Sequence, residues 1–334
     1  MTPPTRRRVL AGLAGLVGTA GCSDTAGEAD TPAETATAAP VPTTRATAAR
    51  RVRPVVTFDG PGPVNLAVGT SGAIYLAMSF AGTVRRLPPG KQTATTRSAA
   101  VTDRLARLPA GDGGVYALAV HDGRVYAALN SHEMSTHGIW TVPTAGGTPQ
   151  RLAAVSPERR LRGLVADPDH ERLLVSDARK GAILTVRLAD GTVTPWLTHR
   201  RLAAERRGPM GLALAGDDLS VTHSDNSQLL ETTVQPTGTA IAPTVRVEAR
   251  VGLSGASGVA VDGTDAYIAA TGLNRLVGID GGGRLRTIAT TADGLNVPTD
   301  VALGADGDAL FVTNFGFKPL VGLTGERSLL RVPL

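Results

Sequence analysis

The sequence predicts an all-β protein: a six-bladed β-propeller built from four-stranded antiparallel blades. Two observations support this prediction, a strand–turn–strand unit that recurs along the chain and an unusual composition. The chain has 334 residues, with 40 glycines and 22 prolines, against 5 phenylalanines, 4 tyrosines and 2 tryptophans. Such a composition favours many short strands and tight turns over packed helices.

Each repeat contains a small-residue turn, a short apolar strand, a turn rich in glycine and aspartate, and a second apolar strand. In the first repeat these are residues 65–68, 69–72 and 73–77. The innermost strands of successive repeats begin at Val64, Tyr116, Arg162, Met210, Ser257 and Thr299, which lie 52, 46, 48, 47 and 42 residues apart. A period of about 40–50 residues with several short strands is typical of propeller blades.

Further strands complete the predicted blades. A third strand is visible at 83–87, 138–142, 183–186 and 275–279. We expect the last strand, 329–332, to lie in the blade whose outer strand is 54–58. This closure would join the two ends of the domain and leave no exposed sheet edge. The propeller is therefore predicted to span residues 52–334.

Residues 1–21 have the features of an export signal. Arg6, Arg7 and Arg8 precede an apolar run over 9–20, which is too short for a stable membrane span. The paired arginines Arg6 and Arg7 resemble the twin-arginine signal, and a Sec signal with a basic head is the alternative. The run ends in Thr19-Ala20-Gly21-Cys22, which resembles a lipobox with cleavage before Cys22. A small-residue cleavage site that happens to end beside a cysteine is the alternative to lipidation.

Residues 22–51 are predicted to form a lipidated Cys22 followed by a disordered tether. Between residues 23 and 50, 19 of 28 residues are alanine, threonine or proline, and apolar periodicity is absent. Several acyl chains on one cysteine would give stable anchoring. We therefore expect an exported protein held by Cys22 on the outer face of the cytoplasmic membrane.

Charge and cysteine content exclude several function classes. The chain carries 34 lysines and arginines against 29 aspartates and glutamates, and three of the arginines lie at positions 6–8. So even a balance, with few aromatic residues for stacking, argues against nucleic-acid binding. The single cysteine excludes an intramolecular disulfide and any cysteine-based zinc or iron–sulfur site. We expect a monomer.

Three segments carry a resemblance to a known family. Residues 62–68 (GPVNLAV), 136–140 (THGIW) and 312–317 (VTNFGF) resemble bacterial members of the senescence-marker-protein/gluconolactonase/LRE-like family. The resemblance spans about 52–334 and implies a six-bladed propeller whose enzymatic members hydrolyse lactones. It also implies a divalent metal, bound at the central channel by Glu in the first blade, Asn in the third and Asp in the fifth.

The residues at those three positions do not suit a metal. They are Val64, which has no oxygen ligand, Arg162, which is positively charged, and Ser257, which offers one neutral hydroxyl. Shifting the alignment by one residue supplies only Asn65 and Asp300, which strand alternation predicts to face away from the channel. We therefore predict no metal cofactor, the alternative being a divalent cation such as calcium or zinc.

The predicted ring suggests two functions. Arg162 would bind a carboxylate or phosphate and Tyr116 would stack or donate a hydrogen bond, which favours a ligand- or protein-binding module of the cell envelope. The alternative for these side chains is that they plug the channel, with Arg162 paired to a carboxylate. The alternative function is a lactone or ester hydrolase with a metal or a rebuilt site. No catalytic residue is assigned.

Four polar segments are further candidates. The loop 130–137, with two histidines and a glutamate, is expected to be solvated, with His137 bonded to a turn carbonyl. Residues 223–226 (HSDN) offer a base and an acid, but Asp and Asn also follow strands for turn reasons. Residues 306–308 (DGD) fit a hairpin better than a calcium loop. Arg200, Arg201, Arg206 and Arg207 form either a solvated loop or an anion-binding patch.

Overall fold

The structure, a computed structural model, describes residues 52–78, 80–92, 98–316 and 326–334. The predicted signal peptide and linker, with Arg6, Arg7 and Cys22, lie outside these residues. Within the described part of the chain, no helix is long and apolar enough to cross a membrane.

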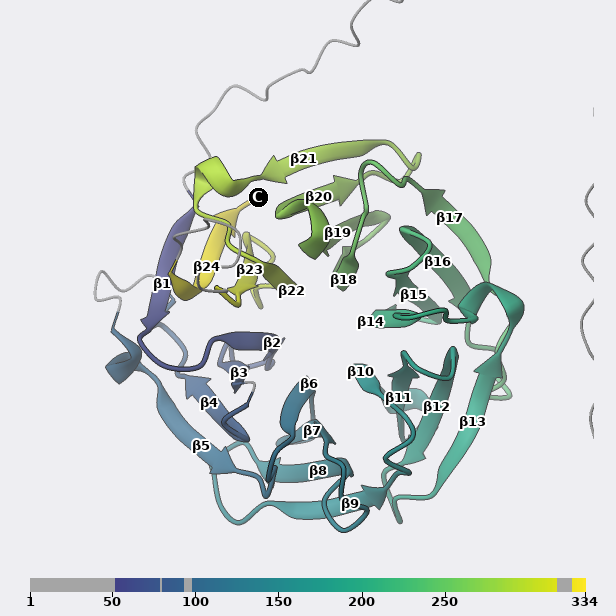
Figure 1. The fold of residues 1–334 in the computed structure, drawn as a ribbon, viewed down its shortest axis with the longest axis horizontal. Coiled ribbons are helices and arrows are strands. Elements are labelled where there is room, and N and C mark those ends of the chain that lie inside the picture. Colours follow the sequence, from purple (N-terminus) through teal and green to yellow (C-terminus); the bar gives the residue numbers. More distant parts are fainter. Residues whose placement is uncertain (1–51, 79, 93–97, 317–325) are drawn as a thin grey trace, which may run out of the picture. The chain divides into compact units, whose positions relative to one another are not determined.

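The described chain forms six sheets of four antiparallel strands arranged in a ring, which confirms the predicted six-bladed propeller (Figure 1). The innermost strands are β2 (Pro63–Val68), β6 (Gly114–His121), β10 (Leu161–Asp167), β14 (Pro209–Ala215), β18 (Ala256–Asp262) and β22 (Pro298–Leu303). The second strands are β3 (Ile74–Met78), β7 (Arg124–Asn130), β11 (Arg172–Asp177), β15 (Asp218–His223), β19 (Asp265–Ala270) and β23 (Ala309–Asn314).

The third and outer strands complete each blade. The third strands are β4 (Thr83–Leu87), β8 (Gly138–Pro143), β12 (Ala182–Arg187), β16 (Gln228–Thr233), β20 (Arg275–Ile279) and β24 (Arg327–Pro333). The outer strands are β5 (Asp103–Arg107), β9 (Gln150–Ala154), β13 (Val193–Thr198), β17 (Thr244–Glu248), β21 (Leu285–Ala289) and β1 (Arg53–Phe58).

Short 3-10 helices occupy some of the connections. They are η1 (Ala99–Val101), η2 (Pro168–His170), η3 (Arg200–Leu202), η4 (Thr271–Leu273) and η5 (Thr291–Asp293).

The ring closes as the sequence predicts. β24 pairs with both β1 and β23, so the sixth blade has the order β1–β24–β23–β22 and contains both ends of the described chain. The first strand of the domain is thus fixed by residues almost 280 positions later, with Arg53 opposite Arg331. This arrangement pairs a strand that would otherwise expose an edge.

The hydrophobic core is divided among the contacts between neighbouring blades. Six clusters of buried side chains each combine residues from two adjacent blades. A blade is therefore covered on both faces, and its second strand is largely buried, as in β3, which is apolar throughout and has all five residues buried. Continuous apolar strands of this kind are what burial on both faces requires. The rigid ring that results positions the starts of the six innermost strands around one centre.

Candidate functional site

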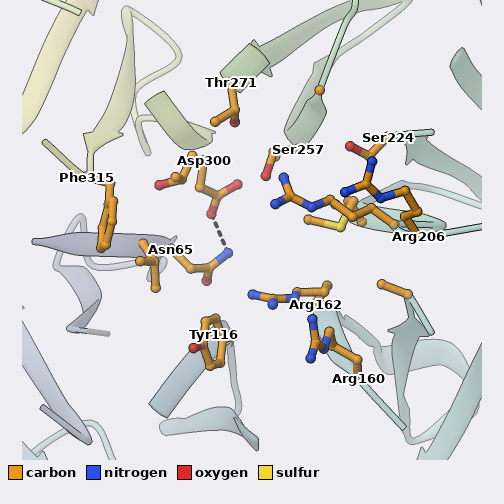
Figure 2. A pocket seen from close by; sticks show the side chains of 18 of the residues that line it. Asn65, Tyr116, Arg160, Arg162, Arg206, Ser224, Ser257, Thr271, Asp300 and Phe315 are labelled. Atoms are coloured by element: carbon orange, nitrogen blue, oxygen red, sulfur yellow. Dashed lines mark hydrogen bonds between the residues drawn. The ribbon is translucent and has the colours of Figure 1, made fainter. Parts of the chain in front are cut away.

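One cavity of about 340 Å³ lies where the six innermost strands begin (Figure 2). All six residues of the predicted ring line it: Val64, Tyr116, Arg162, Met210, Ser257 and Thr299. The volume is at the lower end of the range usual for ligand sites, about 300–1,000 Å³. The six ring residues thus lie at one cavity, and its chemistry also depends on the other residues that line it.

A β-bulge at each ring position directs these side chains inward. In every blade the register between the innermost and second strands shifts where the ring residue lies. The shifts fall between Pro63/Asn65, Val115/Ala117, Leu161/Leu164, Pro209/Leu212, Ala256/Val259 and Pro298/Asp300. A bulge inserts residues with no partner on the neighbouring strand and re-aims a side chain. The ring residues are those inserted residues.

The residue after the ring position packs the innermost strands against one another. A Cβ added to Gly163 would lie 2.2 Å from the carbonyl oxygen of Met210, and one added to Gly211 would lie 2.5 Å from that of Ser257. At Gly258 an added Cβ would lie 1.8 Å from Oδ1 of Asp300. Only glycine permits this approach, which explains why glycines follow three of the ring residues.

Two hydroxyl groups on second strands hold the bulges in place. Ser176 Oγ accepts the Gly163 N–H and donates to the Met210 carbonyl, both at 2.6 Å. Thr222 Oγ1 accepts the Gly211 N–H at 2.9 Å and donates to the Ser257 carbonyl of the next blade. Each hydroxyl thus satisfies a bulge N–H of its own blade and a ring carbonyl of its neighbour. The backbone carrying the ring is therefore fixed independently of the ring side chains.

Asn65 and Asp300 line the cavity, so the expectation that they face away from it was wrong. Strand alternation fails at the bulges, and both side chains turn toward the junction of the first, second and sixth blades. Asn65 Nδ2 donates to Asp300 Oδ2 at 2.5 Å, and its Oδ1 accepts the Leu118 N–H at 2.7 Å. Asp300 Oδ2 also accepts the Leu66 N–H at 3.0 Å.

Burial controls the charge of Asp300. Desolvation raises the pKa of its carboxyl to about 7, although N–H donors from Leu66 and Val301 act in the opposite direction. The group is 6 % exposed. Near neutral pH it therefore exchanges between a neutral acid and a carboxylate.

Arg162 is the most unusual group in the cavity. Its guanidinium lies over the face of the Tyr116 ring, 4.2 Å from the centroid. It lines the cavity as a half-buried residue, and desolvation lowers the pKa of Arg162 to about 10. Among the described residues no carboxylate pairs with it and no acceptor takes a hydrogen bond from it. The sequence allowed for a carboxylate that pairs with Arg162 in a plugged channel. The described residues contain no such carboxylate partner.

Three more arginines lie at the cavity mouth. Arg160 precedes β10, and Arg206 and Arg207 precede β14; Figure 2 shows Arg160 and Arg206 on the side of Arg162. All three are exposed, and their guanidinium groups bond to no other described residue. Asp225 holds the loop by accepting the backbone N–H groups of residues 205, 206 and 207.

The basic stretch 200–207, for which the sequence allowed either a solvated loop or an anion-binding patch, has two parts in the structure. Arg206 and Arg207 line the cavity mouth, whereas Arg201 lies in η3 and donates to the Pro243 carbonyl at 2.6 Å. Arg160 was not singled out in the sequence. The sequence feature that could have identified Arg160 is its position two residues before Arg162, because residues two apart on an extended chain lie on the same side.

The other polar candidates hold turns together. His137 is 1 % exposed, with Nδ1 3.0 Å from the Ser131 carbonyl oxygen, and residues 132–135 of its loop are exposed, so the expected carbonyl contact lies within a solvated loop. His223 is also buried, with Nε2 3.1 Å from the Ala203 carbonyl oxygen, and desolvation lowers the pKa of both imidazoles. Gly307 has φ 68° between β22 and β23, as expected of a hairpin turn.

The residues at the three positions that the family resemblance assigns to metal ligands do meet in the cavity. Val64 and Ser257 supply one hydroxyl between them, and Arg162 brings a cation. This donor set does not fit a hard divalent cation. Among the residues that the structure describes, no three His, Cys, Asp or Glu side chains gather as metal ligands.

Comparison with solved structures identifies the architecture. The chain is similar to regucalcin, a calcium-binding protein from Agrobacterium tumefaciens (16 % identity, TM-score 0.63, covering 84 % of this chain and 92 % of that one). It is also similar to an auxiliary nutrient-binding protein from Bacteroides thetaiotaomicron (11 %, 0.63, 84 % and 75 %) and to streptogramin B lyase (13 %, 0.57, 85 % and 97 %). No family model and no curated protein sequence matches. At these identities the similarity shows the β-propeller fold alone.

Proposed function

We propose that this protein is an exported, membrane-anchored β-propeller of the gluconolactonase-like group that binds a small anionic ligand at the mouth of its central channel. One observation carries the proposal: the Arg162 guanidinium lines the cavity and pairs with no carboxylate among the described residues. Taking a cation out of water is unfavourable unless an opposite charge and hydrogen bonds replace the water. A bound carboxylate or phosphate would provide both.

The surroundings of Arg162 support this. Tyr116 holds the guanidinium by a cation–π contact and leaves its N–H donors for another partner. Arg160, Arg206 and Arg207 add positive charge at the mouth, where it would draw an anion inward. Thr299 and Ser257 add hydroxyl groups to the cavity lining.

Export and anchoring rest on the sequence. Arg6 and Arg7 before an apolar run, and Cys22 at its end, support delivery to the outer face of the cytoplasmic membrane. A tether rich in alanine, threonine and proline would then give the propeller access to extracytoplasmic solutes. The protein would capture a small anion there as a monomer, which is consistent with the closed ring. The corresponding macromolecular partner would be an envelope protein that carries an acidic group.

Titration calorimetry at low ionic strength tests the proposal, with citrate and inorganic phosphate as probes. At least one should bind with a stoichiometry of one, and Arg162→Gln should weaken it by roughly 10- to 100-fold, the usual contribution of hydrogen bonds to a charged group. Arg104→Gln is the control, because Arg104 is exposed on the outer strand β5. Equal affinity in the wild type and Arg162→Gln would reject the proposal.

A hydrolase is the second candidate, because Asp300 lies in the same cavity with its pKa raised to about 7. A carboxyl group with that pKa can act as a general acid or base at neutral pH. Turnover of a lactone or aryl ester that is lost in Asp300→Asn and retained in chelator would support a rebuilt, metal-independent site. Turnover that survives in Asp300→Asn would exclude Asp300 from such a role.

A further inference from the structure

The cavity wall is chemically divided into two sides. Arg160, Arg162 and Arg206 come from the third and fourth blades, whereas Phe80 and Phe315 come from the first and sixth. Figure 2 shows Phe315 on one side of the cavity and Arg206 on the other. An anion bound by the arginines would therefore have an aromatic wall facing its far end.

The two phenylalanines act together. Phe80 lies between β3 and β4, and Phe315 directly follows β23; their ring centroids are 6.3 Å apart with an interplanar angle of 53°. This tilted arrangement is within the range at which aromatic rings attract one another. It creates an apolar surface at the cavity rim from two segments more than 230 positions apart in sequence.

Phe80 adopts a conformation that core packing does not explain. Its φ is 62°, in the left-handed region that bulky residues avoid, and the residue is 67 % exposed. A bulky non-glycine residue in this region is strained, because its Cβ lies too close to the following carbonyl oxygen. Phe80 thus combines backbone strain with exposure of a large apolar ring to water. Strained residues of this kind occur preferentially at ligand sites.

We infer that the ligand is an amphiphilic organic anion, with an acidic group bound by Arg162 and a ring-containing apolar part packed against Phe80 and Phe315. This inference rests on the proposed anion-binding function and adds the ligand's second half. Simple inorganic anions and small hydrophilic acids would use only the arginine side. The limited volume of about 340 Å³ favours an apolar part of one or two rings.

The test uses three probes that separate charge from ring. 2-Naphthoate carries both, acetate carries the carboxylate without the ring, and 2-naphthamide carries the ring without the charge. Each is added at millimolar concentration to the purified protein, and the rise in melting temperature is measured, because a ligand of the native state raises it. Calorimetry then gives the affinity and stoichiometry of 2-naphthoate. We expect 2-naphthoate to bind at least tenfold more tightly than acetate or 2-naphthamide.

Two variants locate the apolar contact. Phe80→Asn removes the ring and keeps the fold, because asparagine tolerates the left-handed region better than phenylalanine. It should weaken 2-naphthoate about tenfold and leave acetate unchanged. Met134→Ala is the matched control, since it removes another exposed apolar side chain away from the cavity. It should change neither.

The outcomes distinguish the ligand class from the anion site itself. If citrate or phosphate binds through Arg162 while 2-naphthoate gains nothing over acetate, the amphiphile is wrong and the anion site stands. If 2-naphthoate binds equally well to Phe80→Asn, the aromatic wall is not the contact and the inference is overturned. If no anion binds at all, the proposed function fails with it.

Discussion

Replacing Asp300 with asparagine should change the pH dependence of stability, because this carboxyl holds its proton in the folded protein. Its pKa rises from 3.8 to about 7 through burial. Between about pH 4 and pH 7 the native state therefore retains a proton that the unfolded chain has released. Stability falls as pH rises whenever the native state binds more protons, so the wild type loses stability across this window.

The magnitude follows from the shift. A difference of about 3 pKa units, at 1.36 kcal/mol each, corresponds to about 4 kcal/mol between pH values below 4 and above 7. Asparagine cannot ionise, and its Oδ1 can still accept from Asn65 and Leu66, the present donors to Asp300. Relative to the wild type, Asp300→Asn should therefore gain up to about 4 kcal/mol as pH rises from about 4 to about 8.

Urea denaturation of both proteins at several pH values measures this difference, since titrations common to both cancel. Asp306→Asn serves as the control, because Asp306 is exposed in a turn of the same blade. A difference between Asp300→Asn and the wild type that does not vary with pH would show that Asp300 is ionised throughout, and the burial argument would be refuted.

Four further outcomes are expected. Anion affinity should increase as pH falls through about 7, because Asp300 becomes neutral within the cavity, and titration calorimetry should show no such increase in Asp300→Asn. Arg162→Gln should lose anion binding without a lower melting temperature, since it removes a desolvated charge, and clear destabilisation would assign Arg162 a structural role. Gly258→Ala should destabilise by roughly 2–4 kcal/mol in urea denaturation because its Cβ would meet Asp300, whereas Gly60→Ala, which has open space, should not. Cys22→Ala should move the exported protein from the membrane fraction to the soluble fraction on immunoblots, and continued membrane association would argue against lipidation.

The fold could be predicted because the physics of a blade repeats in the sequence. The second strand of each blade is covered on both faces. Runs such as 74–78 are therefore apolar throughout, and turns follow them. The pairing of β1 with β24 was predictable for a related reason, since an unpaired strand at either end would leave an exposed edge. Neither argument depends on the identity of a particular side chain.

The site was less predictable because it depends on departures from regular structure. The bulges that bring Asn65 and Asp300 to the cavity break the alternation used to place them. Arg206 and Arg207 reach the mouth because Asp225, almost 20 residues later, holds their loop. Nothing in the sequence marks Phe80 as left-handed, since phenylalanine rarely adopts such a φ.

The construction of the ring also explains why resemblance in fold says little here about chemistry. Ser176 and Thr222 fix the bulge backbone, and Gly163 and Gly211 let the strands approach, so none of these contacts uses a ring side chain. A ring residue can therefore change from a metal ligand to an arginine without disturbing the scaffold. The positive charge of Arg162 repels the cation that an oxygen-ligand ring would attract and favours an anion instead. The same scaffold can therefore present either charge at the channel mouth, according to the side chains at the ring positions.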